Sequence, residues 1–449
     1  MAYEAPPVQI KSLVLTKSSR TLAFILLSIS AFGQTARKPA AKPAVSGKLA
    51  AIHVAGTRRY TPAEIIAASG LRIGVEASQN DFQEAAQRLG DCGFFSDVAY
   101  SYSSVSNGTR LDLELVDSDK LVPAHFENFV WFTDAELLAR IHEKLPLFKD
   151  EVPIAGTLSD QISDILQNLL IPLSNSARAD YVRETKEDGG PVVAVNFRAS
   201  GVTLTLTEIT FQGAGPDQLP ALKTASEKLI GKDYSRSAVA TYAQIYLLPI
   251  YQAQGYLNAR LSNPQPKVVG ETADDTEVSV QLTAVPGVQY KISDIKWEGN
   301  KAFPGDKLQN FVHAKIGDLA NAPKLKSELE EVHKVYTTRG YMMAKVKAEP
   351  KLDDEAKTVA YTLQVSEGDV FHLGDLDIQG LDPKTTGRLR EAWTLRESDP
   401  YDSTYPKRFF DDTVKLLSRD VTWTISIHEG VNEEDKTVDV SLRYGIKPP

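Results

Sequence analysis

A block of sequence recurs along the chain, and this recurrence constrains the fold more than any other feature. Five positions of one block return further on in the same order and at the same spacing. They are Tyr290, Ile292, Ile295, Trp297 and Gly299, which correspond to Phe371, Leu373, Leu376, Ile378 and Gly380. A repeat of this length indicates one small domain used several times in tandem.

Weaker copies of the block occur earlier in the chain. Ile209, Phe211 and Gly213 repeat its end, and residues 133–139 match residues 61–67. Together the copies predict five units of about 70–85 residues each, near the lower limit for a domain that folds alone. The predicted units are residues 48–118, 119–201 (divergent), 202–286, 287–367 and 368–449.

Each unit is predicted to contain a strand, a short helix, a longer helix and two further strands. Apolar residues spaced for one helix face, such as Leu325, Leu329 and Val332, indicate the longer helix, and Pro249 is expected to kink or shorten it in the third unit. Thr61 with Glu64 is spaced for a capping box, as is Thr133 with Glu136. The predicted fold class is α+β: a tandem array of five β-α-α-β-β domains, each a three-stranded mixed sheet covered by two helices on one face.

Recurring glycines mark the expected turns, because glycine adopts the left-handed backbone conformation at little cost. Three of them are placed where a helix C-cap is expected, and the others follow the first strand of a unit. The predicted turn glycines are Gly56, Gly93, Gly213, Gly255, Gly299, Gly340 and Gly380.

The first residues of the chain have the pattern of an export signal. Lys11, Lys17 and Arg20 precede an apolar run that is too short to span a bilayer, and Ala31 and Gly33 are small residues suited to signal peptidase. Residues 1–33 are therefore predicted to be a signal peptide cleaved after Gly33, and residues 34–47 a disordered spacer. An uncleaved interfacial anchor is the alternative, and the long basic region leaves open a start after Met1.

Composition excludes several function classes. The formal net charge of −9 argues against nucleic acid as a partner, and the single cysteine, Cys92, allows no internal disulfide. No later segment is long and apolar enough for a transmembrane helix. Asp375 and Asp377 mimic the start of a calcium loop, but Thr386 stands where its last ligand belongs. We expect no catalytic residues, no metal and no cofactor, and hence no enzyme.

The units resemble POTRA domains, the polypeptide-transport-associated repeats of BamA- and TamA-like outer membrane assembly proteins. The motifs that carry the resemblance are residues 93–98 (Gly-Phe-Phe-Ser-Asp-Val), 255–256 and 340–341 (Gly-Tyr), 297–300 (Trp-Glu-Gly-Asn) and 367–371 (Glu-Gly-Asp-Val-Phe). Those proteins end in a β-barrel, which this chain is expected to lack, so the resemblance does not imply insertase activity. It implies a periplasmic protein, with a place at the periphery of the outer membrane as a further possibility.

The resemblance also implies how such a unit binds a polypeptide. In POTRA domains the second strand lies at a sheet edge, where an extended peptide can be added as a further strand. The expected edge strands are residues 98–104, 259–263 and 344–349, the last two ending at Pro264 and Pro350. The expected binding residues are Val98, Tyr100, Tyr102, Arg260, Leu261, Ala344, Lys345, Val346, Lys347 and Ala348. Lys345 and Lys347 have an alternative interpretation, as charges that protect the edge from pairing.

Two functions remain open at this point. The chain is a scaffold or chaperone for outer membrane or secreted polypeptides, or it is an architectural envelope protein whose units dock fixed, folded partners. In either case the expected partners are proteins; whether a separate barrel protein is one of them does not follow from the sequence. The identity of the client and the oligomeric state do not follow from the sequence.

Overall fold

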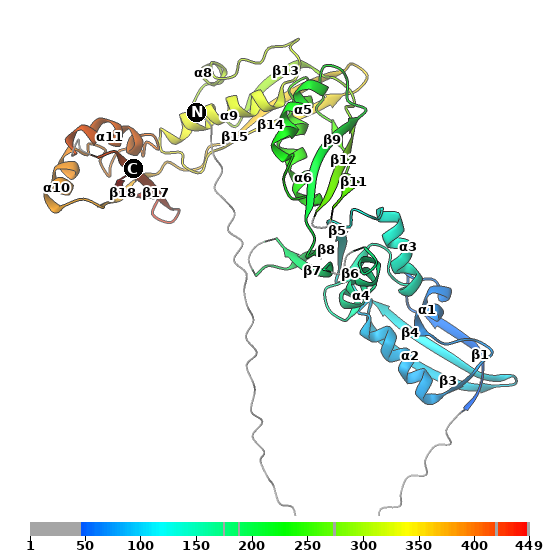
Figure 1. Cartoon of the computed structure of the whole chain (residues 1–449). Coiled ribbons are helices and arrows are strands. Elements are labelled where there is room, and N and C mark those ends of the chain that lie inside the picture. Colours follow the sequence, from blue (N-terminus) through cyan, green and yellow to red (C-terminus); the bar gives the residue numbers. More distant parts are fainter. Residues whose placement is uncertain (1–45, 174–175, 187–188, 273–274, 418–420, 447–449) are drawn as a thin grey trace, which may run out of the picture.

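The computed structural model describes residues 46–173, 176–186, 189–272, 275–417 and 421–446. Within them the chain forms small mixed α+β units that follow one another in sequence order as an extended, bent array (Figure 1). The predicted signal peptide and most of the predicted spacer lie outside the described residues. The first strand, β1, already begins at Ser46, inside the end of the predicted spacer.

The five sheets of the described residues share one plan. The first long strand of each unit runs parallel to the last strand, and the strand before the last pairs antiparallel with the last. The first long strands are β1 (Ser46–Ala55), β5 (Leu121–Phe126), β9 (Leu204–Gln212), β13 (Lys291–Glu298) and β16 (His372–Gln379). The last strands are β4 (Gly108–Asp117), β8 (Val192–Ser200), β12 (Thr276–Val285), β15 (Thr358–Ser366) and β18 (Thr437–Ile446). The strands before them are β3 (Phe95–Val105), β7 (Arg178–Thr185), β11 (Gln265–Glu271), β14 (Lys345–Asp353) and β17 (Trp423–Asn432).

The prediction of three-stranded sheets throughout is wrong for the first three units. Their sheets carry a fourth, short strand: β2 (Glu76–Ser78), β6 (Glu151–Pro153) and β10 (Arg260–Leu261). In the first two units the segment between the two helices pairs with the start of the first strand. The third, fourth and fifth units make the same link as a single bridge. Pairing over so few residues leaves no alternating pattern that a sequence could reveal.

Two helical regions accompany each sheet. They are α1 (Pro62–Ser69) and α2 (Gln79–Asp91), α3 (Asp134–Lys144) and α4 (Leu158–Leu170), α5 (Leu219–Ser226) and α6 to α7 (Arg236–Tyr242, Leu248–Gln252), α8 (Gly305–Gln309) and α9 (Ala322–Thr337), and α10 (Pro383–Ala392) and α11 (Tyr405–Thr413). Both predicted capping boxes are present, Thr61 with Glu64 and Thr133 with Glu136.

Each core lies between the helices and one face of the sheet. In β4, for example, Leu111, Leu113 and Leu115 are buried while the residues between them are less so, which is the period of two expected for a strand with one covered face. The first and second units share one apolar cluster, whereas the third unit (with Val130 of the second), the fourth unit and the fifth unit have separate clusters. The first two units are therefore joined more intimately than the others.

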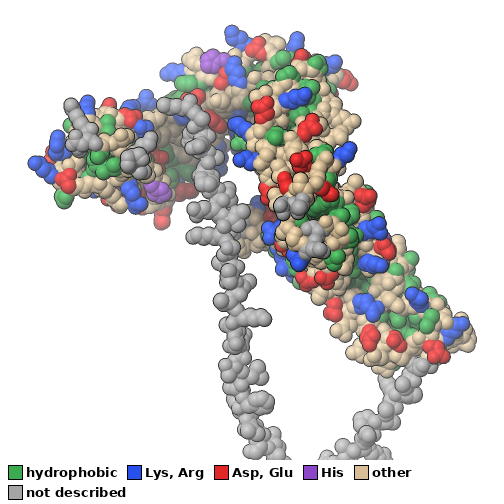
Figure 2. Space-filling model, viewed as in Figure 1, with side chains coloured by type: hydrophobic (Ala, Val, Ile, Leu, Met, Phe, Trp, Pro, Cys, Tyr) green, Lys and Arg blue, Asp and Glu red, His purple; other side chains and the backbone are tan. Residues whose placement is uncertain are grey.

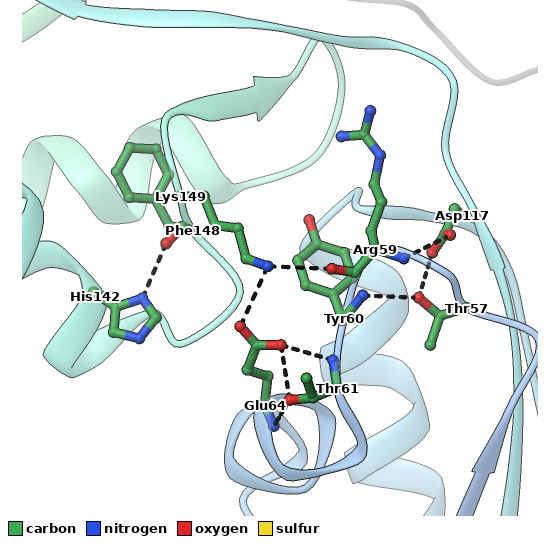
Figure 3. A network of polar contacts seen from close by, with 9 residues as sticks. All are labelled: Thr57, Arg59, Tyr60, Thr61, Glu64, Asp117, His142, Phe148 and Lys149. Atoms are coloured by element: carbon green, nitrogen blue, oxygen red, sulfur yellow. Dashed lines mark hydrogen bonds and ion pairs between the residues drawn. The ribbon is translucent and has the colours of Figure 1, made fainter.

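Polar contacts add to the joint between the first two units (Figure 3). Lys149 of the second unit donates a hydrogen bond to the carbonyl oxygen of Arg59 at 3.2 Å, and its ammonium lies 5.3 Å from the centre of the Tyr60 ring. The same ammonium is 3.4 Å from a carboxylate oxygen of Glu64, the residue that closes the capping box of α1. One carboxylate thus stabilises both a helix terminus and the joint.

This joint is expected to weaken in acid. The backbone N–H of Thr61 holds the pKa of Glu64 below its ordinary value, and Lys149 adds to the effect. A lowered pKa in the folded state gives a stabilisation that is complete above the unfolded value of about 4.3 and is lost as the pH falls through the folded value. We expect Glu64→Gln to melt below wild type at neutral pH and at the same temperature in acid. Glu391→Gln, at an exposed site, is the control. A Glu64→Gln deficit that persists unchanged in acid would contradict this account.

Candidate functional site

The structure places two of the three predicted edge segments at the end of a sheet. Val98, Tyr100 and Tyr102 lie in β3, the terminal strand of the first sheet, with half-buried side chains on the helix side. Lys345 to Ala348 lie in β14, the terminal strand of the fourth sheet. Ala344 immediately precedes β14 and is buried. Both strands therefore have one side that is paired with their own sheet and one side that is not.

The prediction of a continuous edge strand over residues 259–263 is wrong. Arg260 and Leu261 form only the two-residue strand β10, opposite Val285 and Ala284. The longer strand β11 begins at Gln265, on the far side of Pro264. A proline has no N–H to donate to a ladder, and here it separates the edge of the third sheet into two pieces.

The prediction that the edge strand of the fourth unit ends at Pro350 is also wrong. β14 continues through Pro350, which lies opposite Tyr361, and ends at Asp353. Proline is accepted inside a strand at a sheet edge when its nitrogen faces away from the neighbouring strand. Pro350 therefore indicates which residues of β14 face the open side.

The register of β14 follows from this proline. In an antiparallel pair, alternate residues point their N–H and C=O groups toward the partner strand and away from it. Val346 and Ala348 have the same parity as Pro350, so their backbone groups face the free edge, while those of Lys345 and Lys347 face β15. The side chains alternate as well: Val346 and Ala348 pack toward the core, and the two lysines are exposed.

A groove of about 1120 Å³ runs beside this part of β14. One wall is α9 of the same unit, and the other comes from the helical region of the third unit, which lies next to α9 in Figure 1. The groove is lined by Gln244, Ile245, Pro249, Gln252, Leu257, Ala322, Pro323, Leu325, Lys326, Ser327, Leu329, Glu330, His333, Lys345, Val346, Lys347, Ala348, Pro350 and Tyr361. An extended peptide paired to β14 would lie along it.

The wall from the third unit was not predicted as part of a site. Its long helix is interrupted, as expected near Pro249, but the interruption takes the form of a π-helical segment, η2 (Ala243–Leu247), followed by α7. Such segments occur frequently at functional sites. Ile245 of this segment lines the groove and is 56% exposed. Pro249 was the only signal in the sequence for this wall.

Tyr361 adds a polar group to the groove lining. The residue is only 4% exposed, and its hydroxyl has no hydrogen-bond partner among the residues that the structure describes. Burial raises the pKa of Tyr361 to about 12. An uncharged donor without a partner costs free energy unless another group approaches it.

Two of the predicted turn glycines form backbone hydrogen bonds to the unit that follows them. The carbonyl oxygen of Gly255 accepts the backbone N–H of Tyr290 at 2.8 Å, and that of Gly340 accepts the N–H of Phe371 at 2.7 Å. Each glycine thus bonds to the first residue of the repeated block in the following unit. All the predicted turn glycines adopt a positive φ, namely Gly56, Gly93, Gly213, Gly255, Gly299, Gly340 and Gly380.

The three glycines that were expected to be helix C-caps lie slightly beyond the caps. The cap residue of α9, for example, is Thr338, two positions before Gly340. All three glycines lie at the contact with the next unit: the carbonyl oxygens of Gly255 and Gly340 accept N–H groups there, and a Cβ at Gly93 would meet Ala155 and Pro153. The recurrence of glycine with an aromatic residue is therefore a signal for a joint between units.

The described residues offer little for other chemistry. They contain no group of three or more metal-ligating side chains, and none of their helices is both long and apolar enough to cross a membrane. On the face shown in Figure 2, acidic and basic side chains are interspersed along the array. The groove beside β14 is the candidate functional site.

Comparison with known proteins identifies the kind of repeat. The POTRA family model, described as a surface antigen variable number repeat, matches residues 290–368. The chain is 23% identical over 241 residues to a putative outer membrane protein assembly factor of Treponema pallidum, which covers 52% of this chain and 28% of that protein. It is 23% identical over 168 residues to the outer membrane protein assembly factor BamA of Neisseria meningitidis, which covers 37% of this chain and 21% of that protein.

Among solved structures, the chain is similar to the crystal structure of the POTRA3-5 region of Haemophilus influenzae BamA. The sequence identity is 20%, the TM-score is 0.43, and the match covers 55% of this chain and 97% of the other. The chain spans about a quarter of the length of the curated relatives that it matches. The resemblance to POTRA repeats is thus confirmed: the chain carries a match to the POTRA family at residues 290–368 and is similar to BamA-type outer membrane protein assembly factors.

Proposed function

We propose that this chain is a periplasmic POTRA scaffold that binds extended polypeptides by strand addition during outer membrane protein assembly or protein secretion. The free edge of β14 beside the groove is the observation that carries the proposal. Similarity to assembly factors supports the process in which the scaffold takes part, because those relatives are named for it.

Strand addition suits a protein that must accept many sequences. The affinity comes from backbone groups, which every client carries, and the groove needs only to accommodate its side chains. Val346 and Ala348 each offer an N–H and a C=O to the open side, so a client strand would form its ladder with them. Without a client these groups are left to water.

Hydrogen exchange at single amides tests this proposal. The amides of Val346 and Ala348 face the free edge and are expected to exchange quickly in the protein alone. Addition of an unfolded outer membrane protein segment should slow their exchange strongly, because a client carbonyl oxygen then accepts each N–H. The amides of Lys345 and Lys347 are already paired with β15 and serve as internal controls. Unchanged exchange at Val346 and Ala348 under saturating client would refute strand addition here.

An architectural role is the second candidate, and the joints between units favour it. Besides the glycine contacts, Arg236 of the third unit pairs with Asp134 of the second at 2.6 Å, and Trp131 donates to Glu271 at 3.0 Å. Such contacts fix the spacing of units, as an architectural protein requires. Binding of one folded partner in fixed ratio, with no protection at the β14 edge, would favour this role over the first.

A further inference from the structure

The charges beside the free edge of β14 bear on which strands it would accept. Lys345 and Lys347 are exposed on the open face of the sheet, the face away from α9. Their cross-strand neighbours on β15 are Ser366 and Gln364, which carry no charge. Neither lysine makes an ion pair among the described residues. On the other side of β14 lies the open edge, where a residue of an added strand would be the second cross-strand neighbour of each lysine.

The rest of β14 does not share this imbalance. Glu349 lies between Lys347 and Lys351 along the same face, and Asp353 follows, so negative charges accompany the positive ones there. On the α9 wall of the groove, Lys326 is accompanied by Glu330. Lys345 and Lys347 thus stand together at the start of the exposed face of β14, before its first acidic residue, Glu349, in a chain whose formal net charge is −9.

The other face of an added strand meets an apolar surface. Val346 and Ala348 pack toward the core of the fourth unit, and Ile245 and Pro249 of the third unit complete the groove on that side. Side chains of an added strand alternate between the two faces, as they do in β14 itself. One face of the strand would therefore lie beside apolar groups and the other beside two lysines.

We propose that the β14 edge selects amphipathic strands that carry apolar side chains on one face and acidic side chains on the other. This inference rests on the proposed function and adds a substrate class to it. Opposite charges directly across a ladder stabilise strand pairing, and like charges weaken it. The two lysines then weaken pairing with strands that place basic or apolar residues opposite them. They favour strands that place aspartate or glutamate there.

Three short peptides test the inference on the full chain. They share alternating valine on one face and differ on the other face, which carries glutamate, serine or lysine. We expect the wild-type protein to bind the acidic peptide about tenfold more tightly than the basic one at low salt, from two cross-strand charge pairs. The difference should shrink as salt is added, because exposed charges are screened.

Charge reversal provides the matched comparison. In the double variant Lys345→Glu with Lys347→Glu, the preference should reverse in favour of the basic peptide. The control is Lys301→Glu with Lys307→Glu, which changes the net charge of the same unit equally at exposed lysines that do not line the groove. The control should keep the wild-type preference, which separates a local pairing effect from long-range attraction.

The outcomes distinguish this inference from the proposed function. If wild type binds all three peptides equally, or if the control variant reverses the preference as well, charge selection at this edge is wrong while strand addition stands. If none of the peptides binds and the amides of Val346 and Ala348 gain no protection, strand addition fails and the inference fails with it.

Discussion

Gly340→Val is expected to lower the free energy of unfolding of the fourth and fifth units by about 2–5 kcal/mol, from backbone strain and overpacking together. Gly340 has a φ of +85°, a conformation that a β-branched residue adopts only with strain. A Cβ atom there would lie 2.6 Å from the carbonyl oxygen of Phe371 and 2.9 Å from Cγ1 of Val370. The contact that joins two units leaves no room for it.

Gly317→Val is the matched control for this prediction. Gly317 lies in the same unit with a φ of +93°, but nothing stands within 4 Å of its Cβ position. The control therefore reports the backbone strain without the clash, and it should cost less than Gly340→Val. Chemical denaturation of both full-length variants measures the difference. Equal losses would show that the joint tolerates a side chain, and the account of Gly340 as a joint would be abandoned.

The repeating elements could be predicted because they depend on short-range patterns. The last strand of each unit alternates buried and exposed residues, as in Val359, Tyr361 and Leu363, and this pattern indicates a half-buried strand without knowledge of its neighbours. The capping boxes were equally local, since a threonine and a glutamate three residues later satisfy each other. From such local patterns, most helices and strands are predicted close to where the structure has them.

The groove could not be predicted, because it forms between units. Ile245 and Pro249 belong to the third unit, and Val346 belongs to the fourth; they come together through contacts between the two units, among them the Gly255 joint. The π-helical segment before Pro249 has no sequence pattern that separates it from an α-helix with a kink. Pro350 has the opposite effect: the sequence predicts that the strand ends there, whereas β14 continues to Asp353, because an edge strand can contain a proline whose nitrogen faces outward.

Val346→Pro is expected to abolish client binding at the β14 edge while leaving the chain folded. The N–H of Val346 faces the free edge, so its removal deletes a donor to the client but no bond to β15. Pro350 is a natural precedent in the same strand and with the same parity. Lys347→Pro differs by one position only. It removes an N–H that faces β15 opposite Gln364, and it should therefore destabilise the fourth unit by about 3 kcal/mol, the scale of a misplaced proline.

Crosslinking of a denatured outer membrane protein segment measures binding by each variant, and circular dichroism with thermal melting measures folding. Val346→Ala controls for the packing that Val346 loses, because it shortens the side chain but keeps the N–H; it should bind the client. Lys345→Ala should also bind most clients, since backbone groups supply the main affinity. A folded Val346→Pro protein that captures client as well as Val346→Ala does would show that β14 is not the binding edge, and docking of fixed, folded partners would then be the better account of the array.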